Sequence, residues 1–237
     1  MIIIRTPLRI SICGGGTDLP VWYKDHGSMF ISGAINKYIY ITFQKSEYNS
    51  KINLRYSKLE EVERVEDIKH EIIRETLKAY PVEGGVAITS HADIPSGTGL
   101  GSSGSFGVGI LHATWESQNY KSTKSFLASE STRIQIEKLN HPIGPQDQYV
   151  ASFGGINVYE VDKIGTVKVT PFDCKALQNN LVMFYTGVKR DANQILARST
   201  TEGLQEVQNL AYEAKEVLGG QNFDKYGLLL DRHWKAK

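Results

Sequence analysis

"DIPSGTGLGSSGS", residues 93–105, follows an apolar run and precedes a segment with helical periodicity. Its four glycines and four serines favour neither a helix interior nor a hydrophobic core. Glycines in such a loop allow backbone N–H groups to converge, and the N-terminus of the following helix adds a partial positive charge. Both effects favour an anion, of which phosphate is the common one. The stretch therefore predicts a loop that binds the phosphates of a nucleotide.

Three better-known motifs share part of this stretch but fit it less well. Gly99–Gly104 satisfies G-x-G-x-x-G, yet a dinucleotide fold needs a tight turn directly after the strand and a further strand after the helix. A P-loop needs Gly-Lys-Ser/Thr, and a nucleophile elbow needs glycine at position 105, where the chain has serine. A flexible loop with a serine-rich helix start stays as the alternative, although such loops seldom separate a buried strand from an almost uncharged helix.

The segments around the loop predict a mixed α+β fold. Ile, Tyr and Phe-rich or alternating patterns indicate the following strands: 2–12, 27–44, 51–57, 84–94, 148–161 (divided at Gly154–Gly155), 165–172 and 179–187. Helical periodicity indicates helices over 68–80, 105–118, 122–140 (with Ser122 or Thr123 as N-cap), about 192–217, and from 222 to the end. Because strands cluster early and helices late, a regular βαβ alternation is not expected.

Composition limits the partners that the chain can have. It has 237 residues, 41% hydrophobic content and a formal net charge of +1, which gives no bulk attraction to nucleic acid or an acidic membrane. Cys13 and Cys174 lie too far apart for a disulfide framework or a metal-site spacing, so we expect a cytoplasmic location. The N-terminal apolar run is interrupted by Arg5 and Arg9, which indicates a strand rather than a signal peptide, and no run reaches transmembrane length.

Three stretches of the chain together resemble the GHMP kinases. "PSGTGLGSSGS", residues 95–105, is similar to the second motif of that family, P-x-x-x-G-L-G-S-S. "RTPLRISICGGGTDLP", residues 5–20, resembles the first motif in the form used by sugar kinases of the heptose and fucose branch. "HPIGPQDQYVASFGGIN", residues 141–157, resembles the segment that carries the catalytic aspartate. The resemblance extends over essentially the whole chain.

The resemblance implies a fold, a domain division and a reaction. It implies a GHMP kinase fold, with an N-terminal ribosomal-protein-like α+β nucleotide-binding domain over residues 1–175 and part of a ferredoxin-like α+β domain over residues 176–237. It implies that ATP with Mg²⁺ phosphorylates the anomeric hydroxyl of D-glycero-D-manno-heptose 7-phosphate, giving the 1,7-bisphosphate. The expected partner is thus a small sugar phosphate, with a homodimer left open.

One feature of the family is missing from the sequence. The third, glycine-rich motif has no counterpart after residue 160, where the only glycine pair is Gly219-Gly220. We therefore expect the second domain to be incomplete. Two alternatives stay open: a kinase of L-fucose or another sugar, and a non-catalytic relative that binds nucleotide or sugar without turnover.

The resemblance also assigns roles to individual residues. Asp147 is the expected base or orienting group for the acceptor hydroxyl, and Arg9 is expected to neutralise charge at the reacting phosphate. Ser103, or its neighbour Ser102, and Glu137, or alternatively Glu130, are the expected oxygen ligands of Mg²⁺. The residues expected to hold the nucleotide are Pro95, Gly97, Gly99, Leu100, Gly101, Ser102, Ser103 and Gly104. Those expected to hold the sugar are Gly15, Gly16, Thr17, Asp18 and Arg190, with Lys189 beside the last.

Each role has a plainer alternative that the residues alone also allow. Asp147 could be a turn or capping residue, and Asp18 an Asx-type turn before Pro20. Ser103 could cap the helix that follows. Glu137 and Glu130 could be ordinary solvated glutamates. For Arg9 the position inside an apolar strand favours a site role or a buried partner, because an unpaired arginine there would be costly.

Overall fold

The computed structural model describes residues 1–46, 48–187 and 200–236, and its centre is one mixed sheet of seven strands. The strands are β1 (Ile2–Cys13), β2 (Ser28–Ser46), β3 (Ile52–Arg55), β4 (Leu59–Val62), β5 (Gly85–Ala92), β6 (Ile156–Val161) and β7 (Val167–Pro171). They are ordered β4-β3-β5-β2-β6-β7, and β1 pairs with β2. Among these described strands, only the β3–β5 pair is parallel. The expected α+β class is thus confirmed.

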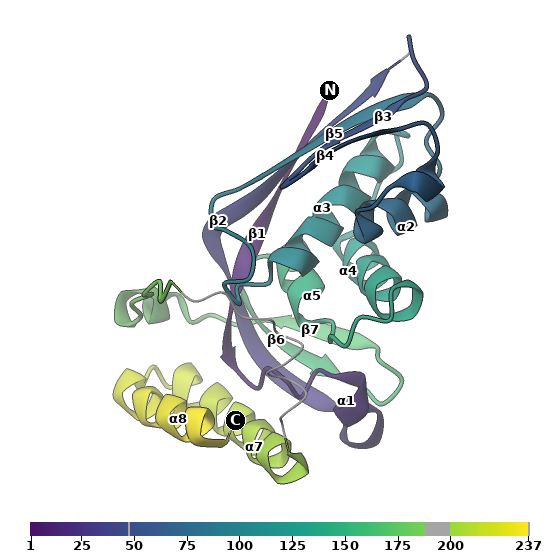
Figure 1. The fold of residues 1–237 in the computed structure, drawn as a ribbon. Coiled ribbons are helices and arrows are strands. Elements are labelled where there is room, and N and C mark those ends of the chain that lie inside the picture. Colours follow the sequence, from purple (N-terminus) through teal and green to yellow (C-terminus); the bar gives the residue numbers. More distant parts are fainter. Residues whose placement is uncertain (47, 188–199, 237) are drawn as a thin grey trace.

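The long strand β2 connects the two halves of the molecule. Residues 39–46 of β2 pair with β5, and residues 28–33 pair with β6. β1 runs antiparallel to β2 along both parts, so the pair forms a twisted ribbon through the molecule (Figure 1).

Helices cover each half of this ribbon. The first group is α2 (Glu71–Ala79), α3 (Ser102–Glu116), α4 (Lys124–Arg133) and α5 (Gln146–Phe153), and the second is α7 (Thr201–Gly219) and α8 (Phe223–Ala236), with α1 (Pro20–His26) beside β6 and β7 (Figure 1). Short turns of helix occur at Val65–Asp67, Ile134–Lys138 and Lys175–Asn180. None of the helices within the described residues is long and apolar enough to cross a membrane.

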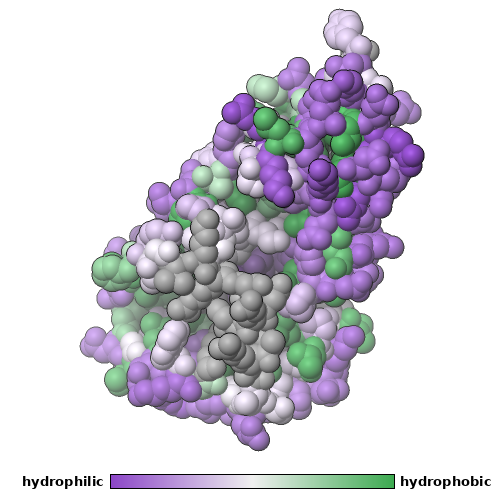
Figure 2. All heavy atoms as spheres, viewed as in Figure 1, coloured by the Kyte–Doolittle hydropathy of each residue, from purple (hydrophilic) through white to green (hydrophobic). Residues whose placement is uncertain are grey.

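Four hydrophobic clusters occur among the described residues, and the two largest hold α2, α3, α7 and α8 to the sheet. In the first, Ile72, Ile73 and Leu77 of α2 and Ile110 of α3 are buried against Ile41 of β2, as the helical spacing of the isoleucines predicted. α3 has ten buried residues, which explains why it carries almost no charge. The second core buries one face of α7 and α8 on the C-terminal end of β1 and the N-terminal end of β2. Over α2 and strands β3 to β5 the surface seen in Figure 2 is mostly hydrophilic.

Two predicted strands are wrong. Residues 148–153 belong to α5, which Pro145 precedes and Gly154, at φ 68°, terminates. The alternating Tyr149, Ala151 and Phe153 fit a strand equally well, so the boundary residues decide in favour of the helix. Residues 179–187 contain no strand, and no strand among the described residues pairs with them. Four of the five apolar side chains there are exposed, namely Val182, Met183, Phe184 and Tyr185.

The remaining boundaries are close to those expected. Thr123 caps α4, because its hydroxyl accepts a hydrogen bond from the Phe126 amide at 3.1 Å. Of the long helix expected over about 192–217, residues 192–199 lie outside the described part of the chain, and α7 begins at Thr201 behind a Thr200 cap. Strand β4 and helix α1 were not expected. The division into residues 1–175 and 176–237 stays a prediction.

Candidate active site

The glycine loop joins β5 to α3 and needs its glycines for backbone reasons. Gly97, Gly99 and Gly101 have φ values of 80°, 77° and 74°, a left-handed conformation that residues with a Cβ rarely adopt. Gly101 occupies the N-cap of α3. The loop is fixed to the first motif because the backbone N–H of Arg9 donates to the carbonyl oxygen of Leu100 at 3.0 Å. The loop and the N-terminus of α3 therefore lie against β1. This arrangement is compatible with the phosphate-binding role predicted for the loop.

Arg9 and Asp147 form an ion pair beside this loop. Arg9 Nε lies 2.6 Å from Asp147 Oδ1, and Arg9 Nη1 donates to the Gly99 carbonyl oxygen at 2.6 Å. The two side chains are 13% and 27% exposed, so the pair is half-buried yet accessible to a solute. The pair explains how an arginine is tolerated in an apolar strand, and it joins β1, the glycine loop and α5 at one point.

Two glycines allow this close approach. A Cβ on Gly101 would lie 2.9 Å from Arg9 Cγ and 3.1 Å from Asp147 Cγ. A Cβ on Gly104, in the first turn of α3, would overlap the Cβ of Asp147 and lie 3.1 Å from the backbone nitrogen of Gln148. The N-terminal turns of α3 and α5 are therefore in direct contact, with the loop above them.

The expected magnesium ligands differ in their surroundings. Ser103 is exposed and its hydroxyl donates to Gln135 Oε1 at 3.3 Å, while Ser102 is half-buried. Glu137 is exposed in the short turn that also carries Gln135. Within the described residues, no three His, Cys, Asp or Glu side chains are grouped as a metal site.

Glu130, the alternative ligand, is occupied by another partner. Its carboxylate accepts hydrogen bonds from Arg133 Nε at 2.8 Å and Nη2 at 2.7 Å. Burial raises the pKa of Glu130, but hydrogen bonds from Arg133 and Tyr80 outweigh burial and hold the pKa below its ordinary value. This geometry favours Glu137 over Glu130 as the residue available to a metal.

The first motif lies directly against the start of α5. The Asp18 carboxylate is 5% exposed, and its oxygens accept hydrogen bonds from the backbone N–H of Gly16 at 2.9 Å and of Gln146 at 3.3 Å. The pKa of Asp18 is raised, and burial is the largest cause. The charge of Asp147 also raises the pKa, whereas the Gly16 amide, the Gln146 amide and the charge of Arg9 lower it. The Thr17 hydroxyl is also buried, donating to the Gly14 carbonyl oxygen at 2.8 Å.

Several residues that complete this arrangement were not expected from the sequence. Gln146 Nε2 donates to Ser11 Oγ at 3.0 Å and to Ser32 Oγ at 3.1 Å. A Cβ on Gly15 would overlap Ser11 Oγ, so the first motif also lies on this polar cluster. Nothing in the pattern around Ser11, Ser32 or Gln146 separates them from solvated polar residues. Arg190 and Lys189, the expected phosphate cations, lie outside the described residues.

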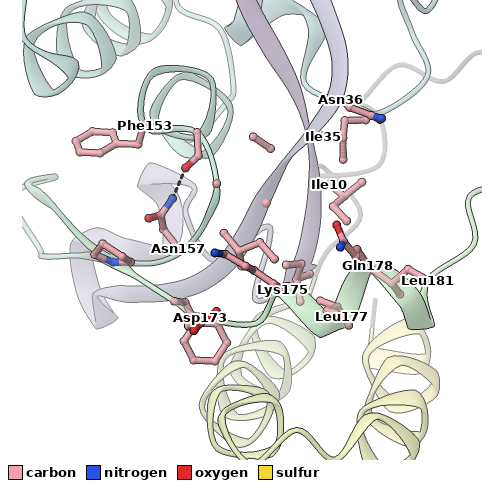
Figure 3. Close-up of a pocket in the computed structure, with 18 residues that line it drawn as sticks. Ile10, Ile35, Asn36, Phe153, Asn157, Asp173, Lys175, Leu177, Gln178 and Leu181 are labelled. Atoms are coloured by element: carbon pink, nitrogen blue, oxygen red, sulfur yellow. Dashed lines mark hydrogen bonds between the residues drawn. The ribbon is translucent and has the colours of Figure 1, made fainter.

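A cavity in the described part of the chain lies beside β1 and β6 and is not lined by these residues. It has a volume of about 900 Å³ and is lined by Ile10, Ile35, Phe153, Lys175 and Leu177 among others (Figure 3). Ile10 and Arg9 point to opposite faces of β1, since side chains alternate along a strand. None of the site residues expected from the sequence lines this cavity.

Comparisons with known proteins bear on the whole arrangement. Residues 67–155 match the family described as GHMP kinases N terminal domain. The D-glycero-alpha-D-manno-heptose 7-phosphate kinase of Campylobacter jejuni is 27% identical, over 98% of this chain and 76% of its own length. The galactokinase of Pyrococcus furiosus is 26% identical, over 93% of this chain and 61% of its own length.

Solved structures show the same fold. A D-glycero-D-manno-heptose 1-phosphate kinase from Bacteriodes thetaiotaomicron has a TM-score of 0.85 at 22% identity, covering 100% of this chain and 79% of that one. The galactokinase of Lactococcus lactis, complexed with galactose, has a TM-score of 0.69 at 18% identity, covering 98% and 73%. The sheet, the glycine loop and the Arg9–Asp147 pair thus occur on a fold shared with sugar kinases.

Proposed function

We propose that this chain, whose residues 67–155 match the GHMP kinase N-terminal domain, is a sugar kinase of that family and phosphorylates the anomeric hydroxyl of D-glycero-D-manno-heptose 7-phosphate with ATP. The product would be the 1,7-bisphosphate. The observation that supports the proposal is the contact between Arg9, Asp147 and the glycine loop, because one carboxylate and one cation lie beside a loop and helix N-terminus of the kind that favours phosphate.

The residues present divide the work of phosphoryl transfer between them. The N–H groups of the loop and of the first turn of α3 would hold the triphosphate oxygens, since a helix N-terminus favours negative charge. Asp147 Oδ1 is held by Arg9, which leaves Oδ2 to accept the proton of the attacking hydroxyl. The sugar oxygen then bonds to the γ-phosphorus as the bond to the bridging oxygen breaks and ADP leaves. Positioning supplies much of the rate in such a reaction.

Magnesium is the metal that this reaction implies, and the residues present fit it. Ser103 is exposed, and the next residue in the sequence, Gly104, contacts Asp147. The Ser103 hydroxyl donates to Gln135, and the exposed Glu137 lies close to Gln135 in the sequence. One hydroxyl and one carboxylate beside nucleotide phosphates is a usual magnesium environment. When bound, Mg²⁺ would neutralise charge on the phosphate oxygens.

Sugar choice distinguishes this proposal from its nearest alternative. A kinase of L-fucose or galactose needs no second phosphate site, whereas the heptose 7-phosphate needs a cation for its own phosphate. Arg190 is our candidate for that cation because arginine binds phosphate through two hydrogen bonds. The rate of ADP formation distinguishes the two kinds of kinase when it is measured with heptose 7-phosphate, free heptose, galactose and L-fucose. A preference for an unphosphorylated sugar would contradict the proposal.

The role of Asp147 has its own test. Asp147→Asn keeps the shape of the side chain but removes its charge, so we expect turnover to be lost while the affinity for a non-hydrolysable ATP analogue stays nearly unchanged. A near-normal rate in this variant would show that Asp147 is not the base. A wild-type chain that binds the analogue but forms no ADP with any sugar would instead favour the non-catalytic alternative.

A further inference from the structure

Gln135 is a buried amide side chain that connects the end of α4 to the first turn of α3. It is fully buried, and it lies in the short turn Ile134–Lys138 that continues α4. Its Nε2 donates to the carbonyl oxygen and to the hydroxyl of Ser131, at 3.4 and 3.3 Å. Its Oε1 accepts from the Ser103 hydroxyl at 3.3 Å. Both polar atoms of this buried side chain therefore have partners.

These partners determine which way the amide faces and where the Ser103 proton points. A carbonyl oxygen only accepts hydrogen bonds, so the group that faces the Ser131 carbonyl has to be the NH₂ of Gln135. The amide oxygen of Gln135 then faces Ser103. Because an amide oxygen donates nothing, the Ser103 hydroxyl is the donor. The proton of Ser103 is thus directed to Gln135, and lone pairs of the Ser103 oxygen are left for another partner.

The backbone around Gln135 has a wider turn than an α-helix. The N–H of Leu139 donates to the carbonyl oxygen of Ile134, five residues earlier, at 3.1 Å, so residues 134–138 form a turn of π-helix. Single turns of this kind occur frequently at functional sites. The turn that carries Gln135 also carries Glu137, the candidate carboxylate for the metal.

α3 approaches Gln135 closely because position 107 has no side chain. A Cβ on Gly107 would lie 2.6 Å from Gln135 Nε2 and 2.7 Å from Ser131 Oγ. Gly107 is not among the glycines with positive φ, so its backbone does not require glycine. Glycine inside a helix is destabilising relative to alanine, and close packing against this amide is what the position gains in return.

Packing alone does not explain the bond between Gln135 and Ser103. A methionine or leucine could fill the same space between α3 and α4 without needing polar partners. Ser103 is exposed, so water could satisfy its hydroxyl in the absence of Gln135. The bond is therefore not needed to satisfy Ser103, but it does select one orientation of its hydroxyl.

We propose that Gln135 is a positioning residue, which holds the proton of Ser103 so that the Ser103 oxygen presents its lone pairs to the divalent cation of the bound nucleotide. A metal ligand has to offer a lone pair, and side chains that hydrogen-bond to a ligand commonly set its orientation. The inference rests on the proposed kinase function, because the cation enters with the nucleotide. Of the two candidate serines, it assigns the metal-side hydroxyl to Ser103.

The test measures how tightly Mn²⁺, which prefers the same oxygen ligands as Mg²⁺ and is visible by EPR, binds the chain with a non-hydrolysable ATP analogue. Gln135→Met keeps the length of the side chain and removes its donor and its acceptor, and Gln205→Met on the exposed face of α7 is the matched control. We expect Gln135→Met to weaken Mn²⁺ binding about 10- to 100-fold, the range typical for loss of a ligand's partner. The affinity for the analogue without metal should not change, and Gln205→Met should bind Mn²⁺ like the wild type.

A double-mutant cycle separates positioning from packing. Ser103→Ala removes the hydroxyl on which Gln135 acts, so Gln135→Met in that background should cause no further loss of Mn²⁺ affinity. An equal loss in both backgrounds would show that Gln135 only supports the fold. Wild-type Mn²⁺ affinity in Gln135→Met would likewise overturn the proposal.

A milder variant covers the case in which Gln135→Met does not fold. Ser131→Ala removes one of the two acceptors that hold the Gln135 amide. It should weaken Mn²⁺ binding in the same direction but less, again with no further loss beside Ser103→Ala. Unchanged Mn²⁺ affinity in Ser131→Ala would then count against the proposal.

Activity measurements distinguish a failure at Gln135 from a failure of the proposed function. In an active enzyme, Gln135→Met should raise the Mg²⁺ concentration for half-maximal rate about 10- to 100-fold and leave KM for the sugar phosphate unchanged. A raised KM for the sugar with an unchanged Mg²⁺ requirement would refute the role of Gln135 and leave the kinase function standing. A chain that shows the expected Mn²⁺ cycle but phosphorylates no sugar would keep that role and refute only the proposed function.

Discussion

Replacing Gly104 with alanine has two opposite effects on stability, and each can be estimated separately. By helix propensity alone, alanine in α3 would stabilise the protein by up to about 1 kcal/mol. The added methyl group would overlap Asp147 Cβ and approach the backbone of α5, which cannot rotate away as a flexible side chain could. Overpacking of this kind costs about 1–3 kcal/mol, so the expected net change is a loss of about 0–2 kcal/mol in the free energy of unfolding.

The effect on rate should exceed the effect on stability. Relieving the overlap requires the first turn of α5 to move by about 1 Å, and displacement by that amount lowers rates about 100-fold, or about 2.7 kcal/mol in activation free energy. The assay is ADP formation at saturating substrates, beside a urea melt. Gly227→Ala in α8 is the matched control, because no atom lies within 4 Å of a Cβ there, and it should stabilise the chain without changing kcat. A Gly104→Ala enzyme with wild-type kcat would refute the packing argument.

Two further predictions concern charged side chains. Arg9→Lys should lower kcat/KM about 10- to 100-fold, because one ammonium group cannot bind both the Asp147 carboxylate and the loop carbonyl oxygen. Arg5→Lys is the control, because the Arg5 guanidinium stacks on a tyrosine ring. Equal rates in the two variants would contradict this role of Arg9. Glu130→Gln should leave activity intact and lower stability at neutral pH. Since its pKa lies below 4.5 in the folded chain, the stabilisation by Glu130 is present above that pH and is lost as the pH falls through the folded-state pKa. The difference in the free energy of unfolding between Glu130→Gln and wild type should therefore disappear at acidic pH. A difference that does not change with pH would contradict this prediction.

The candidate site residues could be proposed from the sequence, whereas most of the contacts between them could not. The glycine loop, the helix after it and the segment around the candidate aspartate, Asp147, are local patterns, so they could be identified before any contact was known. Arg9 was recognisable because its charge conflicts with an apolar strand. That its partner is Asp147, 138 residues away, depends on the fold and has no local signal.

The errors have one physical origin. Tyr149, Ala151 and Phe153 alternate as in a strand, and the apolar run over 181–185 is equally typical of one. A strand forms only where a neighbour completes its hydrogen bonds, and neither segment has that neighbour among the described strands. Gln146 and Gln135 went unnoticed for a related reason, since their importance lies in what they touch across the chain.

The single ribbon of β1 and β2 also has a thermodynamic consequence. Tyr226 of α8 donates to the Ile12 carbonyl oxygen at 2.9 Å, within the first motif, and Gln208 of α7 accepts from Trp22 at 2.6 Å, just after that motif. Detaching α7 and α8 would therefore loosen the end of β1 from which Gly14 to Asp18 continue. Melting of the last two helices and loss of catalytic geometry should consequently occur as one cooperative transition, so that a substitution far from the nucleotide, in the second core, changes the temperature at which the enzyme inactivates.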